Sequence, residues 1–429
     1  MTKKIIESKF TFFKAGQGCF YGGRIFNIEK KKIYTIVYDC GTSKNVSGNT
    51  KSLSDEIAFF EKYPSFTKKA RKVIDILFIS HLDYDHVSGL KKLLMLFEVK
   101  LIVLPYLDDE LKAITLASVS YTSQSDEDEE LLSIEEYNLF IQDPASLLRN
   151  RNNDATIIYI TDEDDGDENA QQSNIGVDDV VVTATSRNDI GTTGISEVLK
   201  NNAYIALDDH WEFIPHRLKV DDSKIRLFKT ALRKKVKDFK TVSLKQLILN
   251  NRKFAHECYE KLIGEVNCHG LVLYHGPILI KNNTSTCSIS VENNIVGFAY
   301  GKYYYTGNTE NHVGTLLMGD TSINPKNNPI KFPVRISKKS ETMAIIQIPH
   351  HGAKANWSST RFSKFFNIPV EGEACCPMAV CNFGVGNRYG HPHPSIIDTL
   401  SINFLPNTQF NRVDVEINVC KEAASEVTS

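Results

Sequence analysis

Short apolar runs separated by polar breaks dominate the first hundred residues of the chain. Residues 54–63 and 87–97 carry apolar side chains at helical spacing, which predicts two helices. Four other runs are short and rich in β-branched or aromatic residues, which predicts strands. These four runs are Phe10–Phe13, Ile33–Tyr38, Val73–Ser80 and Val99–Pro105. Strands that alternate with helices favour the α/β class.

The pattern loosens over residues 108–265, which we interpret as a large insertion within a single domain spanning residues 1–429. Acidic runs at 123–136 and 161–168 predict solvated or disordered loops; the alternative is a mobile acidic flap that mimics or excludes nucleic acid. Arg217–Lys253 is basic and predicts an amphipathic helix with a solvated face, or else a surface that contacts nucleic acid.

Strand-like runs return after the insertion. We expect strands at Leu271–Tyr274, Ile295–Phe298, Gly314–Met318 and Met343–Ile348. Because they resemble the early strands in character, the C-terminal half is expected to close the domain that the N-terminal half begins.

Composition adds few constraints. The 429 residues are 41% hydrophobic and 24% charged, which is typical of a soluble protein, and the net charge of −2 gives no overall attraction to nucleic acid. We find no signal peptide and no run of 18 apolar residues, so no membrane span is expected. Nine scattered cysteines are more typical of structural thiols in a reducing cytoplasm than of disulfides.

The strongest chemical signal is a loop between a predicted strand and a predicted helix. It contains His81, Asp83, Asp85 and His86. Such a loop lies at the carboxyl end of a strand, where open α/β sheets usually form their sites. Histidine and carboxylate ligands together suit divalent first-row metals, so the loop predicts a metal site.

Three later segments repeat this placement at a strand end. Asp320 follows an apolar strand, and its two carboxylate oxygens can bridge two metal ions. His350 and His351 follow the next strand, and the polar loop Asn387–Pro394 contains two histidines and an arginine. Repetition at several strand ends is what a shared site at one sheet edge requires.

With these motifs in place, the sequence resembles the metallo-β-lactamase superfamily, and within it the hydrolase domain of ComEC-type competence DNA-uptake proteins. The resemblance covers residues 10–105 and 267–405. The matching segments are Ala15–Cys19, Tyr38–Gly41, His81–His86, Gly319–Asp320, Pro349–Gly352 and Asn387–Pro394. It implies a four-layer αββα sandwich with a large insertion between the His81–His86 motif and the second half.

The resemblance also implies roles for individual residues. His81 and Asp83 would hold one divalent ion, Asp85 and His86 the second, and Asp320 would bridge them. His350 or His351 would complete the second site, with His351 favoured, and Asp85 would also orient the attacking hydroxide. Near the substrate we expect Arg388 and His391 as catalytic groups, and Asn387, His393 and Lys354 as substrate-binding groups.

Two departures from the superfamily pattern concern the first metal. A further histidine ligand before the bridging Asp is missing, and His269 is only a substitute candidate. Asp83 also stands where many members have histidine, which shifts the preference from Zn²⁺ toward Mn²⁺ or Mg²⁺. We therefore expect two divalent ions, Mn²⁺ or Zn²⁺.

Three functions follow as hypotheses. The first is a cytoplasmic phosphodiesterase or nuclease that acts on DNA in DNA processing or defence. The second is hydrolysis of a small ester, thioester or lactam, because one fold hosts many reactions. The third is a sensor or effector subunit whose activity is gated by a protein partner that contacts the insertion.

Overall fold

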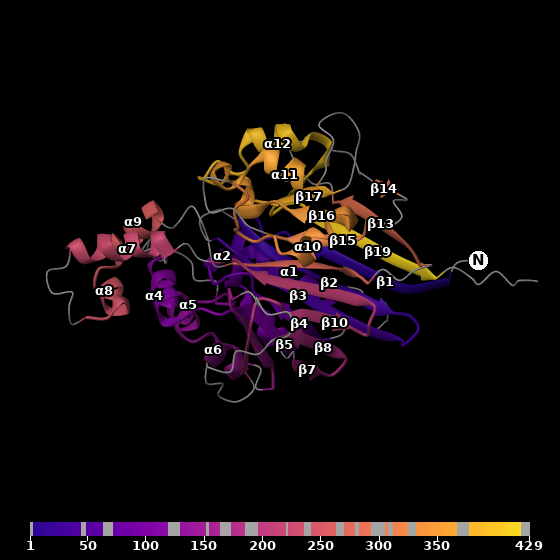
Figure 1. Ribbon diagram of the computed structural model, residues 1–429, viewed down its shortest axis with the longest axis horizontal. Helices are drawn as coiled ribbons and strands as arrows, with labels where there is room; N and C mark the ends of the chain where they lie inside the picture. The colour runs from indigo at the N-terminus through magenta and orange to yellow at the C-terminus, as the bar shows by residue number, and fades with distance from the viewer. Residues whose placement is uncertain are drawn as a thin grey trace, which may run out of the picture.

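A computed structural model describes most of the chain. The described residues are 3–43, 49–62, 72–118, 129–151, 154–163, 173–184, 196–219, 222–235, 242–262, 270–278, 283–292, 305–307, 312–324, 332–366 and 377–421. Within these ranges, the strands form two large sheets (Figure 1).

The first sheet holds the N-terminal strands. Its spatial order is β14 (Tyr305–Gly307), β13 (Asn283–Val291), β19 (Val413–Lys421), β1 (Lys3–Phe12), β2 (Gly18–Asn27), β3 (Lys32–Thr42), β4 (Val73–Phe78), β5 (Glu98–Pro105), β6 (Thr156–Ile160) and β9 (Ser196–Leu199). The strands from β3 to β9 run parallel, and the remaining pairs are antiparallel.

The second sheet holds most of the later strands. Its order is β18 (Phe404–Asn407), β17 (Met378–Asn382), β16 (Met343–Gln347), β15 (Gly314–Leu317), β12 (Leu271–Pro277), β11 (Trp211–Arg217), β10 (Tyr204–Leu207), β8 (Val180–Ala184) and β7 (Ser173–Val177). Here β15 to β18 run parallel.

Helices cover the outer face of each sheet. The first sheet is covered by α1 (Asn49–Lys62), α3 (Leu90–Leu96), α4 (Asp109–Ser118), α5 (Ile134–Gln142) and α6 (Pro144–Arg151). Further out, α8 (Leu244–Asn250) and α9 (Arg252–Leu262) pack on α4, and α7 (Asp222–Lys235) packs on α9. The second is covered by α10 (Val334–Ser337), α11 (Ser359–Phe366) and α12 (Pro394–Leu400). Short helical turns are α2 (Tyr84–Val87), η1 (Ser340–Thr342), η2 (Pro349–Gly352), η3 (Lys354–Asn356) and η4 (Ser401–Asn403).

Alternation along the strands explains why the layers form. In and just after β4, Ile76 and Phe78 belong to the core between the two sheets, whereas Leu77 and Ile79 belong to the core under the outer helices. Strands that are apolar on both faces need cover on both sides. The result is the four-layer αββα sandwich that the sequence predicts.

Most predicted elements are confirmed within the described residues, one is divided and one is untested, and the structure also has strands that were not predicted, such as β13, β17, β18 and β19. The strand β2 is missed because its glycine-rich sequence carries little strand signal. The helix predicted at 87–97 is two pieces, α2 and α3, that break at Ser88 and Gly89. The strand predicted at Ile295–Phe298 lies outside the described residues.

The segment 108–265 is built into the sandwich to a greater extent than expected. It supplies β6 and β9 to the first sheet, four strands to the second, and the helices α4 to α9. Part of the first acidic run forms the start of α5, where Ser133 and Glu136 make a reciprocal capping box. Residues 123–128 and 164–168 of the two acidic runs lie outside the described residues.

The basic segment forms α7, α8 and the start of α9, as an amphipathic arrangement with Phe228 and Leu232 buried. Two of its residues differ from expectation. Arg217 belongs to β11, where its buried guanidinium lies 3.5 Å from Asp162. Leu227 is 58% exposed although it is apolar. Over the described residues, none of the helices has the length and apolar character needed to cross a membrane.

One polar contact crosses the core between the two sheets. The Tyr21 hydroxyl lies 2.9 Å from Nε2 of His275, and both side chains are fully buried among aromatic rings. Burial lowers the pKa of His275 to about 3, whereas an unfolded histidine titrates near pH 6.5. Below about pH 6.5, His275 is protonated in the unfolded chain but stays neutral in the folded chain. The folded state therefore loses stability as the pH falls.

We predict that His275→Phe removes this pH dependence. Between about pH 7 and pH 5, the free energy of unfolding of the wild type should fall by about 2 kcal/mol more than that of the variant. Urea unfolding of both proteins at the two pH values measures the difference. Parallel pH profiles for the two proteins would show that His275 is not the titrating group.

Candidate metal centre

The two blocks of parallel strands end at the same edge of the sandwich. The His81–His86 loop follows β4, and Asp320 follows β15. His350 and His351 follow β16 within η2. The structure thus brings these strand-end groups together, as parallel strands predict, although they are up to 270 residues apart in the chain.

Two glycines let the His81–His86 loop lie directly against the first sheet. A Cβ atom on Gly18 would lie 2.6 Å from the carbonyl oxygen of Asp85, and one on Gly41 would lie 2.5 Å from the carbonyl carbon of His86. Any larger residue would push the loop away. This close approach explains why glycine is needed at positions 18 and 41, in β2 and β3.

Asp320 lies at the middle of the cluster. One carboxylate oxygen is 3.2 Å from Nε2 of His86 and 3.7 Å from Nε2 of His351. The other oxygen is 3.8 Å from Nε2 of His81 and 3.9 Å from Nε2 of His350. The two oxygens therefore face two different pairs of histidines, which suits a carboxylate between two cations.

The aspartates of the loop divide in the same way. Asp83 lies 3.8 Å from Nε2 of His81, while Asp85 lies 3.2 Å from Nε2 of His351. Ligand atoms of Asp85, His86, Asp320 and His351 all lie within 4.8 Å of one another. This spacing is small enough for one ion to contact all four groups.

The two histidines after β16 owe their positions to an unusual backbone. Both have positive φ, 47° for His350 and 53° for His351, in a region that side chains other than glycine seldom adopt. The turn is held because His350 N–H donates to Gly319 O at 3.0 Å and the Gln347 side chain accepts from Gly319 N–H at 3.1 Å. Strain of this kind is typical of functional sites.

Hydrogen bonds fix which nitrogen each histidine turns to the centre. Nδ1 of His86 lies 2.8 Å from the Asp39 carboxylate, and Nδ1 of His351 lies 2.9 Å from Asn382 O. Both partners only accept, so each Nδ1 carries a proton and each Nε2 faces the centre. His81 follows the same rule through Ser80, whose hydroxyl donates to Asp39 and accepts from His81 Nδ1 at 2.8 Å.

These donors fit a divalent cation. Nε2 of His81 and Nε2 of His86 are buried and make no hydrogen bond within the described part of the chain. Ring nitrogens this close to carboxylate oxygens need a positive charge between the two, either a proton or a metal ion. Histidine nitrogen with carboxylate oxygen is a common ligand set for Zn²⁺ and Mn²⁺.

The protonation of the cluster also indicates a need for positive charge. Burial lowers the pKa of His86, but the negative charges of Asp320 and Asp39 outweigh burial and raise that pKa well above its ordinary value. Burial favours a raised pKa for Asp320, yet the charges of His350, His86 and His351 hold that pKa well below the ordinary range. The carboxylate thus stays ionised and attracts cations.

Two residues behind the histidines were not assigned a role from sequence. Asp39, at the end of β3, accepts from the Ser80 N–H at 2.7 Å and from the Ser80 hydroxyl at 2.6 Å, besides its contact with His86. Cys19 lies beside them and accepts from the Gln347 side chain at 3.3 Å. An acidic residue at a strand end is the signal that could have identified Asp39.

The Asn387–Pro394 loop lies at the rim of the centre. The His391 ring is half-buried, 5.9 Å from the ring of His350. Arg388 is exposed and stacks on Tyr389, with 5.3 Å from its guanidinium carbon to the ring centre. Asn387 holds the loop, because its amide donates to Gly384 O and His391 O and its oxygen accepts from the N–H groups of Tyr389 and His391.

Three other candidates have different surroundings. His393 caps α12 by accepting from the Ser395 N–H at 3.3 Å. Lys354 is exposed in η3, just after the two histidines, and its ammonium makes no hydrogen bond or ion pair with the described residues. His269 lies outside the described residues.

We predict that Asp39→Ala lowers the affinity of the centre for Mn²⁺ or Zn²⁺ by roughly 10- to 100-fold, because His86 and Ser80 lose the group that orients them. Calorimetric titration of metal into the purified protein measures the change. Asp75→Ala is the matched control, since Asp75 is also a buried carboxylate and bonds the Thr35 N–H at 2.7 Å, in a different position. Equally weakened metal binding in both variants would argue against the orienting role.

The sequence was also compared with known proteins. No curated protein matches the chain, so the finer resemblance to competence DNA-uptake hydrolases stays a prediction. The family model described as the metallo-beta-lactamase superfamily matches residues 31–170, which include β3, β4 and the His81–His86 loop. Together with the four-layer fold, this match supports a metallo-beta-lactamase superfamily domain, and that superfamily implies a metal-dependent hydrolase.

Proposed function

We propose that the protein is a metal-dependent phosphodiesterase that hydrolyses the backbone of DNA, and that it holds two divalent ions, Mn²⁺ or Zn²⁺. The observation that carries the proposal is the convergence of three histidine Nε2 atoms on the ionised Asp320. Free thiols at six described cysteines favour a reducing compartment, which agrees with a cytoplasmic location.

Each part of the centre has a proposed task. His81 and Asp83 would hold one ion, Asp85, His86 and His351 the other, and Asp320 would contact both. When bound, the ions would polarise the phosphate oxygens and lower the pKa of an attacking water toward about 7. Asp85, 3.2 Å from His351, would accept a hydrogen bond from that water and so orient it.

The rim favours an anionic substrate over a neutral lactam or thioester. Lys354 is exposed three residues after His351, and Arg388 is exposed in the loop that places the His391 ring 5.9 Å from the ring of His350. A guanidinium binds phosphate oxygens through two parallel hydrogen bonds. Arg388 would therefore hold the phosphate, and His391 would donate a hydrogen bond to the leaving oxygen.

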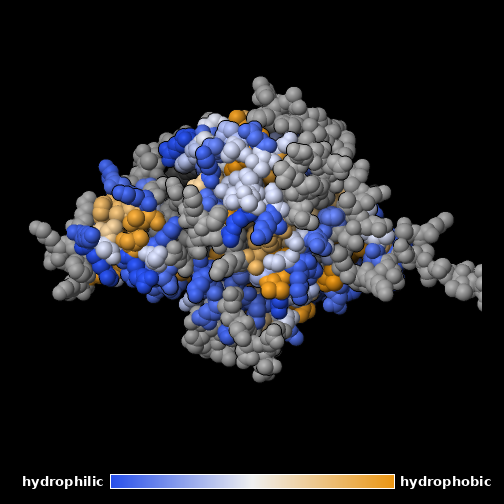
Figure 2. All heavy atoms as spheres, turned by 45° about the horizontal axis from the view of Figure 1, so that its top comes forward, coloured by the Kyte–Doolittle hydropathy of each residue, from blue (hydrophilic) through white to orange (hydrophobic). Residues whose placement is uncertain are grey.

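A lobe formed by α4, α7, α8 and α9 supports nucleic acid as the substrate. Figure 1 shows it projecting beside α2, and the four helices pack on one another. The elements α7, α8 and α9 hold ten Lys and Arg but only three Asp and Glu. In Figure 2 its surface is mainly hydrophilic around a hydrophobic area. Exposed cations on this lobe are Arg226, Arg233, Lys234, Lys245, Arg252, Lys253 and Lys261.

We predict that Asp320→Ala abolishes hydrolysis, by roughly 10³-fold or more, because both ions lose a shared ligand. The assay uses plasmid DNA and bis-p-nitrophenyl phosphate with added Mn²⁺ or Zn²⁺, beside a panel of lactams and thioesters. Asp398→Ala, which removes an exposed carboxylate on α12, should retain full activity.

The panel also separates the three hypotheses. Turnover of a lactam or thioester without DNA cleavage would replace the phosphodiesterase assignment. Metal binding without turnover of any substrate would favour a sensor or effector gated by a partner. Full activity in Asp320→Ala with unchanged metal content would refute the assignment of the centre.

The lobe gives a separate prediction. Reversing Arg233 and Lys234 to Glu should weaken DNA binding and reduce its salt dependence. The slope of log K against log salt should fall in magnitude by about 0.9 for each phosphate that the protein no longer neutralises. Fluorescence anisotropy at several salt concentrations measures this slope. The matched control reverses Arg361 and Lys364, exposed cations on α11, and an equal change there would indicate only an effect of net charge.

A further inference from the structure

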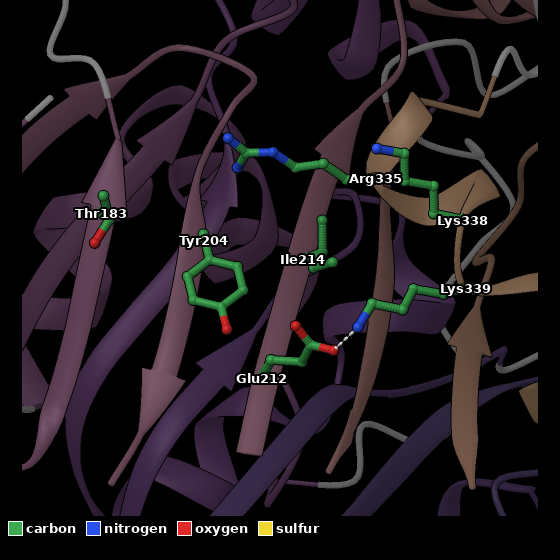
Figure 3. A pocket seen from close by; sticks show the side chains of 7 residues that line it. All are labelled: Thr183, Tyr204, Glu212, Ile214, Arg335, Lys338 and Lys339. Carbon is green, nitrogen blue, oxygen red and sulfur yellow. Dashed lines mark hydrogen bonds and ion pairs between the residues drawn. The ribbon is translucent and has the colours of Figure 1, made fainter. Parts of the chain in front are cut away.

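A second cavity lies on the outer face of the second sheet, beside α10. Its volume is about 400 Å³, within the range of small-molecule sites. Figure 3 shows Arg335, Lys338 and Lys339 along one side, facing side chains of the strands. The strands contribute Thr183, Tyr204, Glu212 and Ile214.

Strand register explains why these side chains share one surface. Tyr204 of β10 pairs with Thr183 of β8, and β10 pairs in turn with β11, which carries Ile214 and Glu212. Glu212 and Ile214 are two residues apart, so they point to the same side of the sheet. The cavity therefore has a rigid floor of three strands, and its other side is formed by α10 and the residues that follow it.

The charges around the cavity do not cancel. Lys339 forms an ion pair with Glu212, whose side chain is only 6% exposed. The ammonium of Lys339 also lies 5.7 Å from the centre of the Tyr274 ring. Arg335 uses one N–H to bond Asn202 O at 2.8 Å, which leaves further donors on the guanidinium. Lys338 makes no ion pair with the described residues. Two positive charges thus remain, those of Arg335 and Lys338.

The two ends of the cavity differ in chemistry. Figure 3 places Arg335 and Lys338 toward one end, and the pair of Glu212 and Lys339 toward the other. Burial, and then the charge of Glu212, raise the pKa of Tyr204 to about 12, so its hydroxyl stays protonated. One end therefore suits a dianion, while the other offers an acceptor and a donor to neutral polar groups.

We propose that this cavity binds a small phosphomonoester of the nucleoside monophosphate class. Arg335 and Lys338 would match the two negative charges of the phosphate. Tyr204 and Ile214 would contact the flat faces of the sugar and base, and Glu212 would accept a hydrogen bond from a sugar hydroxyl. The phosphate could belong to a free nucleotide or to the phosphorylated end of a nucleic acid strand.

The cavity is separate from the metal centre. Lys339 precedes β16, whereas His350 and His351 follow it. A five-residue strand spans roughly 16 Å, so a ligand of this size would not reach both places. The inference therefore goes beyond the proposed hydrolysis and does not depend on it.

The test measures binding to the full-length protein after metal is removed with a chelator, so that the metal centre does not capture phosphate. Calorimetry compares adenosine monophosphate with adenosine, and a 5′-phosphorylated dinucleotide with its unphosphorylated form. We expect the phosphate to strengthen binding at least tenfold in one or both pairs. The pair that shows it identifies the source of the phosphate.

The variant Arg335→Glu with Lys338→Glu should weaken binding at least tenfold, because both charges face the ligand from exposed positions that do not support the core. Arg361→Glu with Lys364→Glu is the matched control, with the same residue types at the same spacing on α11, and should bind as the wild type does. Thermal unfolding checks that both variants fold. Equal affinity in the two variants, or no binding of any phosphomonoester at millimolar concentration, would overturn the proposal.

Discussion

Three histidine Nε2 atoms converge on one ionised carboxylate, and a positive charge between them makes this close approach favourable. His81, His86 and His351 each have Nδ1 bound to an acceptor, so each directs Nε2 toward Asp320. Buried nitrogen and oxygen atoms that face one another in this way are unfavourable unless a proton or a metal ion lies between them. The rest of the structure can be understood as the framework that holds this arrangement in place.

That framework is a consequence of parallel strands in both sheets. β3 and β4 in one sheet, and β15, β16 and β17 in the other, all end at the edge where the donors lie. The clustered histidines and carboxylates follow the ends of β4, β15 and β16, whereas their hydrogen-bond partners Asp39 and Asn382 lie within β3 and β17, near the ends of those strands. Glycines 18 and 41 then allow the loop from β4 to approach the sheet closely.

Sequence could predict the donors but not the partners that orient them. His81, Asp320 and His351 follow clear apolar strands, and that placement is visible in the pattern of residues. The proton on each Nδ1 depends on Asp39, Ser80 and a backbone carbonyl, whose contacts exist only after the sheets have packed. The capping role of His393 and the burial of Arg217 depend in the same way on the folded surroundings of each side chain.

Residues 108–265 show that the sequence also could not predict how short strands pair in the fold. Residues 108–265 looked like an insertion because their strands are short and lie between charged runs, yet six of these strands extend the two sheets. Pairing with β5 and β12 supplies the stability that the short strands lack by themselves.

The charge of the chain is distributed unevenly. The total of −2 results from a lobe that is strongly positive and a remainder that is more negative than the total. Electrostatic attraction falls off over about 8 Å at physiological salt, so a polyanion near the lobe responds to local charge and not to the total. An overall charge near zero is therefore compatible with binding to DNA, because the cations are concentrated on α7, α8 and α9.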